Sequence, residues 1–176
     1  MRKSFVKLLA GGLVLGGLSV PALAQSTANT NATATTKIIT PISIVKVTDL
    51  AFGSVVKPAT TGTNTILIDA TTGARTMTGT GTASIVTASA SGRATFTVTG
   101  EGAQTFTIST PPTVSMTSGA NSIVVTLTTS ASPATLSGAI GSTGTSTIGV
   151  GGSFPLPNTQ ASGSYTATFA TTVTYN

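Results

Sequence analysis

Three acidic side chains are the only carboxylates with which this 176-residue chain could do chemistry. Asp49, Asp69 and Glu101 lie 20 and 32 residues apart, and the chain contains no histidine and no cysteine. The usual nucleophile–base pairs and zinc ligands are therefore missing from its composition. Paired-carboxylate catalysis or an oxygen-ligated metal site would need residues that the chain scarcely has. We expect no enzymatic activity, no cofactor, no metal and no small-molecule substrate.

The first 24 residues have the pattern of a secretory signal peptide. Cations stand at the start, an apolar run occupies 8–20, and the small residues Ala22 and Ala24 precede the expected cleavage before Gln25. Thirteen helical residues reach only about 20 Å, which is less than the ~30 Å hydrocarbon core of a bilayer. We therefore interpret the run as a signal rather than an anchor, and expect export through the periplasm to the cell surface.

Cleavage would leave a weakly charged mature chain from 25 to 176. Its five cations against three acids give five minus three, a net charge of +2. Such scattered cations form no patch for nucleic acid. Because the chain has no cysteine, it would enter an oxidising compartment without disulfides to stabilise it. The five cations are Lys37, Lys46, Lys57, Arg75 and Arg93.

Residue usage and spacing predict an all-β fold, because threonine, serine, glycine, valine and isoleucine dominate. Short alternating segments separated by turn residues are typical of a sandwich or barrel. We expect 94–99 and 105–109 to pair as a hairpin. We expect a turn at 69–73 and a flexible glycine-rich loop at 149–152. Further strands are expected at 42–47, 66–68, 75–78, 84–88, 114–116 and 123–127, with 148–150 as an edge strand.

An alternating segment precedes the expected body. Between 25 and 38 the large and small apolar side chains occupy even positions, which is a period of two. Pro41 cannot donate to a strand ladder and separates this segment from the first strand of the body. The sequence thus predicts a signal peptide at 1–24, an N-terminal extension at 25–40 and a β-domain at 41–176. The apolar even positions are Ala28, Ala32, Ala34 and Ile38.

The closing segment 163–176 has the most regular alternation in the chain. One face is apolar for about twelve residues, so we expect one strand longer than the usual ~5–6 residues. Tyr175 is the penultimate residue, and Gly163 is the fourteenth from the end. The apolar face would carry Tyr165, Ala167, Phe169, Val173 and Tyr175.

These terminal features resemble the pilin subunits of the chaperone–usher pathway. Such subunits end in a long alternating strand with a penultimate aromatic residue and a glycine fourteen residues from the end, and an alternating extension precedes their body. The chain also resembles a family of secreted bacterial domains of unknown function. The motifs that carry this second resemblance are 39–44, 49–53, 96–100 and 163–176, and it covers roughly 37–176.

The pilin resemblance implies an immunoglobulin-like β-sandwich that lacks one strand, so that an apolar groove stays open beside the C-terminal strand. A periplasmic chaperone would first lend a strand, and an outer-membrane usher would exchange it for the extension of another copy. The donor side chains would be Ala28, Ala32, Ala34 and Ile38, and Ile38, Ile42 and Ile44 form an alternative donor. The groove strand would contribute Gly163, Tyr165, Phe169, Val173 and Tyr175.

The function implied by this resemblance is that of a structural subunit in a surface fibre, a fimbria or pilus, which supports adhesion or biofilm formation. A shaft subunit is favoured over a tip adhesin, because the mature chain has no room for an additional binding domain. Two alternatives remain open. One is a self-complemented matrix module whose own extension fills its groove. The other is a small outer-membrane β-barrel, which would also end in an alternating aromatic strand.

Overall fold

The computed structural model describes residues 27–176, so the predicted signal peptide at 1–24 lies outside the described residues. The compact β-body begins at Lys37 and continues to Asn176. Residues 27–36 belong to a separate unit, in which they form no strand and their side chains are exposed. Between residues 27 and 176, no helix is long and apolar enough to cross a bilayer.

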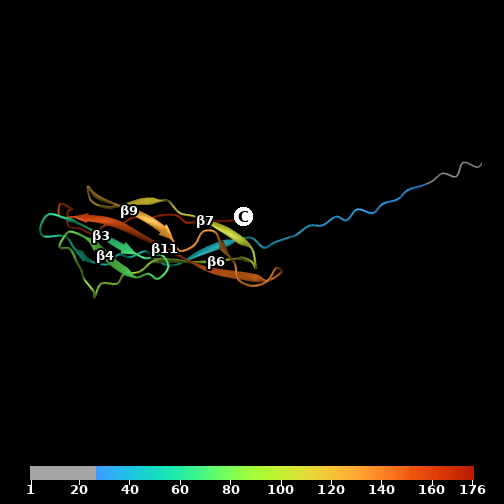
Figure 1. Cartoon of the computed structure of the whole chain (residues 1–176), viewed down its shortest axis with the longest axis horizontal. Coiled ribbons are helices and arrows are strands. Elements are labelled where there is room, and N and C mark those ends of the chain that lie inside the picture. The colour runs from blue at the N-terminus through green and yellow to red at the C-terminus, as the bar shows by residue number, and fades with distance from the viewer. Residues whose placement is uncertain (1–26) are drawn as a thin grey trace, which may run out of the picture. The chain divides into compact units, whose positions relative to one another are not determined.

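The body is built from antiparallel strands, which confirms the predicted all-β class (Figure 1). Within the described residues every regular element is a strand. The strands are β1 (Ser43–Thr48), β2 (Val55–Val56), β3 (Thr63–Ile68), β4 (Arg75–Gly79), β5 (Ser84–Ile85), β6 (Ala94–Glu101), β7 (Thr105–Ser109), β8 (Thr113–Ser118), β9 (Asn121–Thr129), β10 (Ala134–Thr135), β11 (Thr143–Pro157) and β12 (Thr172–Tyr175).

Strand β11 is the centre of the largest sheet, which has seven strands (Figure 1). Its first half pairs with β6, and its second half pairs with β3. Near the middle of β11, the segment from Val150 to Ser153 pairs with β9. Strand β1 extends the sheet beyond β6, β4 extends it beyond β3, and β8 extends it beyond β9. Two smaller sheets have the orders β10-β7-β12 and β2-β5.

The expectation of a flexible loop at 149–152 beside an edge strand is wrong, because this segment is the buried middle of β11. The glycines serve close packing of backbones rather than flexibility. A Cβ on Gly151 would lie 2.6 Å from the Ala70 amide nitrogen and would also collide with the Ile68 carbonyl oxygen. Only a residue without a side chain lets the neighbouring backbone approach so closely.

The predicted hairpin between 94–99 and 105–109 is also wrong, although both strands exist. Strand β6 pairs with β1 and β11, whereas β7 pairs with β10 and β12 in another sheet. The chain crosses between sheets at the intervening turn, and Val98 of β6 packs in the same buried cluster as Phe106 and Ile108 of β7. Alternation shows which face of a strand is buried, but it does not show which edge is paired.

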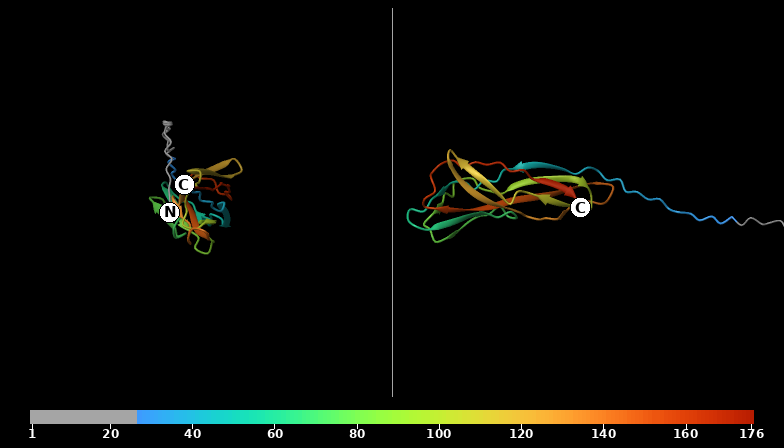
Figure 2. Two further views of the ribbon diagram at one scale, coloured as in Figure 1. Left: turned by 90° about the vertical axis from the view of Figure 1, so that its right-hand side faces the viewer. Right: turned by 90° about the horizontal axis from the view of Figure 1, so that it is seen from above.

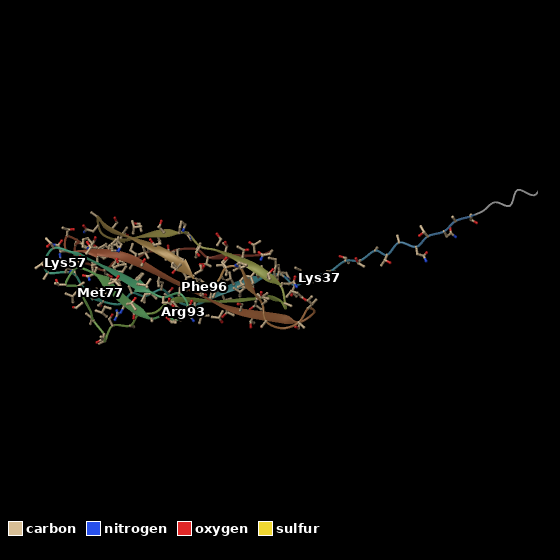
Figure 3. All side chains as sticks on the ribbon, in the orientation of Figure 1. Lys37, Lys57, Met77, Arg93 and Phe96 are labelled. Atoms are coloured by element: carbon tan, nitrogen blue, oxygen red, sulfur yellow. The ribbon has the colours of Figure 1, made fainter. Side chains whose placement is uncertain are left out.

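Two hydrophobic clusters form the core. The main cluster contains Phe52, Phe96 and Phe154, and the second joins β6, β7 and β11 through residues such as Val98 and Ile148. Figure 3 places Phe96 in the middle of the body, with Lys57 and Lys37 at its opposite ends. The core thus lies along β11 and its three paired neighbours, β3, β6 and β9, together with β7.

The C-terminal segment forms a shorter strand than expected. Instead of one strand over 163–176, only β12 at Thr172–Tyr175 is regular, and Figure 2 shows it beside β7. Earlier in the segment there is a single bridge between Thr166 and Thr117. The strand is short because β7 ends at Ser109, which pairs with Thr172. Residues 163–171 therefore have no adjacent strand along most of their length.

Candidate functional site

A groove with an apolar floor lies beside the C-terminal segment, and we call it the C-terminal groove. It consists of two hollows with volumes of about 580 and 170 Å³. The hollows share four lining residues, so they form one continuous depression. The shared residues are Leu50, Phe52, Met116 and Tyr165.

The floor of the C-terminal groove is the main hydrophobic core. The rings of Phe52 and Phe154 meet edge to face, with their centroids 4.9 Å apart and an interplanar angle of 86°. Leu50, Met116 and Phe169 pack against the same cluster but remain only partly buried. Apolar core side chains are therefore left partly uncovered along this line, a feature that marks interaction sites on soluble proteins.

The two walls of the groove differ in their backbone pairing. In the first wall, Ala51 forms a two-way backbone bridge with Gly92, and β2 pairs with β5. In the second wall, residues 160–169, Thr166 is the one residue in a backbone bridge within the described structure. Most of the second wall thus presents backbone N–H and C=O groups that belong to no ladder, which is the property of a strand edge that can accept another strand.

A polar cluster connects the two walls at one end of the groove. Lys57 donates a hydrogen bond through Nζ to the Gln160 carbonyl oxygen at 3.0 Å. The Gln160 Nε2 donates to the Tyr165 hydroxyl oxygen at 2.6 Å, and that hydroxyl donates to the Ala161 carbonyl oxygen at 2.8 Å. Figure 3 shows Lys57 at the end of the body opposite Lys37. Among the residues from 27 to 176, Lys57 is the only cation that lines either hollow, and it is therefore already hydrogen-bonded.

The structure divides the five expected groove residues into two groups. Gly163, Tyr165 and Phe169 line the hollows. Val173 and Tyr175 lie outside both hollows and pack against the second hydrophobic cluster. The expected donor side chains are exposed, and Ile38 retains 89% of its accessible surface. The remaining donor residues, all without regular structure, are Ala28, Ala32 and Ala34.

Each of the three acids has its own separate partner. Asp49 pairs with Lys46 at 2.6 Å. Asp69 closes the predicted turn, and the backbone N–H of Thr72 bonds its carboxylate at 2.6 Å and holds its pKa below the ordinary value. Glu101 is buried and bonds Thr40. Asp49 and Asp69 thus bond residues close to them in the sequence, as expected of the turn at Asp69, whereas Glu101 bonds a residue 61 positions away.

Sequence reasoning missed most of the groove. The first wall and the floor come from Leu50, Phe52, Met116 and Phe154, none of which was a predicted site residue. The motif at 49–53 was the available signal for the first two. Their position opposite the C-terminal segment follows from the sheet topology, which the alternation of side chains does not specify.

The described residues thus form an all-β body of antiparallel sheets, with an open groove that has an apolar floor beside its C-terminal segment. A family model described as "Domain of unknown function (DUF4402)" matches residues 42–175, so the chain belongs to this family. No curated protein and no solved structure matches the chain. The expected membership in a family of unknown function is confirmed, and the resemblance to pilin subunits stays a prediction.

Proposed function

We propose that the chain is a structural, non-enzymatic subunit of a surface fibre whose copies are joined by strand exchange. The body would be an immunoglobulin-like β-sandwich that lacks one strand, and the N-terminal extension of another copy would supply it. The subunit would be exported to the cell surface, where the fibre supports adhesion or biofilm formation. The observation that carries this proposal is the C-terminal groove, which opens onto the core beside a wall with almost no backbone pairing.

The extension has the chemistry that such a groove needs. Residues 27–36 carry no charge, and their alanines recur on one face if the segment is extended. The floor of the groove is apolar, its rim carries uncharged polar residues such as Ser54 and Ser164, and the Lys57 ammonium at one end is already hydrogen-bonded. Lys37 is the one charged residue of the proposed donor 28–38, and it lies on the face opposite the alanines if the segment is extended. The strand can therefore enter without the large cost of burying an unpaired charge.

Backbone pairing would contribute more to the joint than side chains. Three buried alanines and one isoleucine would stabilise it by about 4–5 kcal/mol. Ten or so main-chain hydrogen bonds, at about 1 kcal/mol each, would contribute roughly twice as much. Alanine is a smaller donor side chain than the large aliphatic residues common in chaperone–usher pilins. The larger contribution of the main-chain hydrogen bonds would compensate for the smaller side-chain contribution.

An open groove beside an unpaired edge is an aggregation hazard in a free subunit. We therefore expect a periplasmic chaperone to cover it before assembly and an outer-membrane usher to catalyse the exchange. The partners are thus other copies of this chain, a chaperone and an usher.

Cysteine cross-linking in the full-length chain tests the proposal, because there is no native cysteine to interfere. One variant combines Ala32→Cys with Ser164→Cys, a position that lines the groove. Fibre formation predicts a ladder of covalent multimers after oxidation. The matched control is the double variant Asn31→Cys with Ser164→Cys. It should cross-link less, because residue 31 would face away from the groove in the inserted strand.

The cross-linking pattern also separates the competing functions. A covalent monomer without multimers would indicate a self-complemented matrix module. Absence of any cross-link with Ala28→Cys, Ala32→Cys and Ala34→Cys, each paired with Ser164→Cys, would refute insertion of the extension altogether.

A further inference from the structure

Three distant parts of the chain meet at Thr40. The Thr40 hydroxyl donates to Glu101 Oε2 at 2.8 Å, and the Thr40 amide donates to the same oxygen at 3.3 Å. The Tyr175 hydroxyl donates to the Thr40 carbonyl oxygen at 2.9 Å and accepts a hydrogen bond from the Glu101 amide at 2.7 Å. All three polar atoms of Thr40 thus have partners, and we call this arrangement the Thr40 clamp.

The carboxylate of the clamp is buried and needs these donors. Glu101 is only 4% exposed, and its second oxygen accepts a hydrogen bond from the Gly141 amide. The Gly141 N–H and then the Thr40 hydroxyl and amide hold the pKa of Glu101 below its ordinary value, and the charge of Lys37 acts in the same direction. A buried carboxylate that lost the Thr40 donors would be left partly unsatisfied, which is costly.

The neighbouring backbone is shaped to admit the tyrosine. A Cβ on Gly100 would collide with the Tyr175 hydroxyl oxygen and would lie 3.1 Å from Leu136 Cδ1. Glycine at this position of β6 therefore leaves the space in which the hydroxyl reaches both Thr40 and Glu101. Tyr175, which the sequence placed in the groove, acts here through its hydroxyl at the start of the body.

Side-chain burial changes at the same point in the chain. Ile38 is 89% exposed, whereas Ile42 and Ile44 are half-buried and pack against the second hydrophobic cluster. Residues after the clamp are therefore already part of the core of their own body. Moving them into another copy would break the clamp and uncover that cluster.

We infer that the Thr40 clamp is a fixed boundary, so that residues 40–44 stay in their own body and the segment available for exchange ends at Ile39. The statement about the segment available for exchange rests on the proposed function. It selects 28–38 as the donor and excludes the alternative donor built on Ile38, Ile42 and Ile44. The donor of the partner copy is then a strand of small side chains that ends in one isoleucine.

Hydrogen–deuterium exchange on the full-length mature chain, before and after assembly, tests the inference. The Thr40 amide should exchange at least tenfold more slowly than the amides of 30–36 before assembly. Assembly should then protect 28–38 and leave 40–44 unchanged. Fast exchange at Thr40, or a change at 40–44 on assembly, would overturn the boundary.

A conservative variant separates the clamp from general stability. Tyr175→Phe removes the hydroxyl but keeps the ring in the second cluster, so Thr40 should exchange faster while β1 remains protected. Equal Thr40 exchange in the variant and the parent would contradict the clamp. If assembly protects no residue of the extension, the proposed function fails, whereas slow exchange at Thr40 in the same experiment would still support the boundary.

Discussion

A single added carboxylate should distinguish the two faces of the extension. Ala32→Asp places a charge on the face expected to enter the groove of the next copy, and Asn31→Asp places the same charge one residue away on the opposite face. The groove floor is apolar, and Lys57, the one cation that lines the hollows within the described part of the chain, already bonds Gln160. The aspartate at 32 would therefore be buried without a partner.

The expected cost follows from that environment. Burying an unpaired charge costs at least about 3 kcal/mol, which corresponds to more than a hundredfold weaker joint. The loss is large beside the ~4–5 kcal/mol that all donor side chains supply together. Asn31→Asp should weaken the joint by less than about 1 kcal/mol, because its carboxylate would stay in water.

Assembly of the purified chains measures this difference. Size-exclusion chromatography and electron microscopy should show fibres for the parent and Asn31→Asp, and single subunits for Ala32→Asp. Thermal unfolding of the unassembled subunits should be the same for all three chains, because both positions precede the body at Lys37. Fibres from Ala32→Asp, or an equal loss with both variants, would refute the reasoning.

Three further changes test packing and charge. Phe52→Ala should lower the free energy of unfolding by about 3–5 kcal/mol in chemical denaturation, because a buried ring is lost from the groove floor, and a loss under about 1 kcal/mol would contradict this. Gly151→Ala should lower the free energy of unfolding by about 1–3 kcal/mol, because its Cβ would collide with neighbouring backbone. Nothing lies within 4 Å of a Cβ on Gly92, so the control Gly92→Ala should change stability by less than about 1 kcal/mol. Equal effects of the two substitutions would contradict the close packing at Gly151. The pKa of Glu101 lies below its ordinary value of 4.5, chiefly because the Gly141 N–H bonds the carboxylate, so its stabilisation is present at neutral pH and is lost as the pH falls through the lowered pKa. Glu101→Gln should remove this part of the acid unfolding curve, and an unchanged curve would contradict the assignment.

Strand positions could be predicted from the sequence, but strand partners could not. Alternation located β3, β6, β7 and β9 because one face of each is buried. It failed to show that β6 and β7 belong to different sheets, since both arrangements bury the same side chains. The partner of a strand depends on long-range packing, which a local pattern does not contain.

Glycine was the residue type that misled the sequence reasoning most. At 149–152 it was interpreted as flexibility, whereas it permits β11 to pass between closely packed backbones. The two meanings differ only in what surrounds the glycine. The sequence around Glu101 was also informative but was not interpreted. Glu101 is one of only three acids in the chain and stands between two glycines, and in the structure it is buried in the Thr40 clamp.

Only part of the second wall of the candidate groove was accessible to sequence reasoning. Tyr165 and Phe169 were predicted because they share one face of an alternating segment, and Gly163 was predicted from the resemblance to pilins; all three line the hollows, and their role in strand exchange stays a prediction. Val173 and Tyr175 share that face but lie where β12 pairs with β7, so they pack in the second cluster instead. The groove exists only where the segment lacks a neighbour, and that limit is a property of the topology.

The positions of the clamp and the groove bear on the shape of any assembly. The body begins at Lys37, and Lys57, which closes the groove, lies at the opposite end of the body (Figure 3). A joint that uses different surfaces on the two copies is heterologous, and it produces an open filament unless a rotation closes it into a ring. A donor that leaves one end of a subunit and enters a groove that reaches the other end therefore favours linear growth. Because the Thr40 clamp fixes where the donor ends and the body begins, each joint would repeat with the same spacing along such a filament.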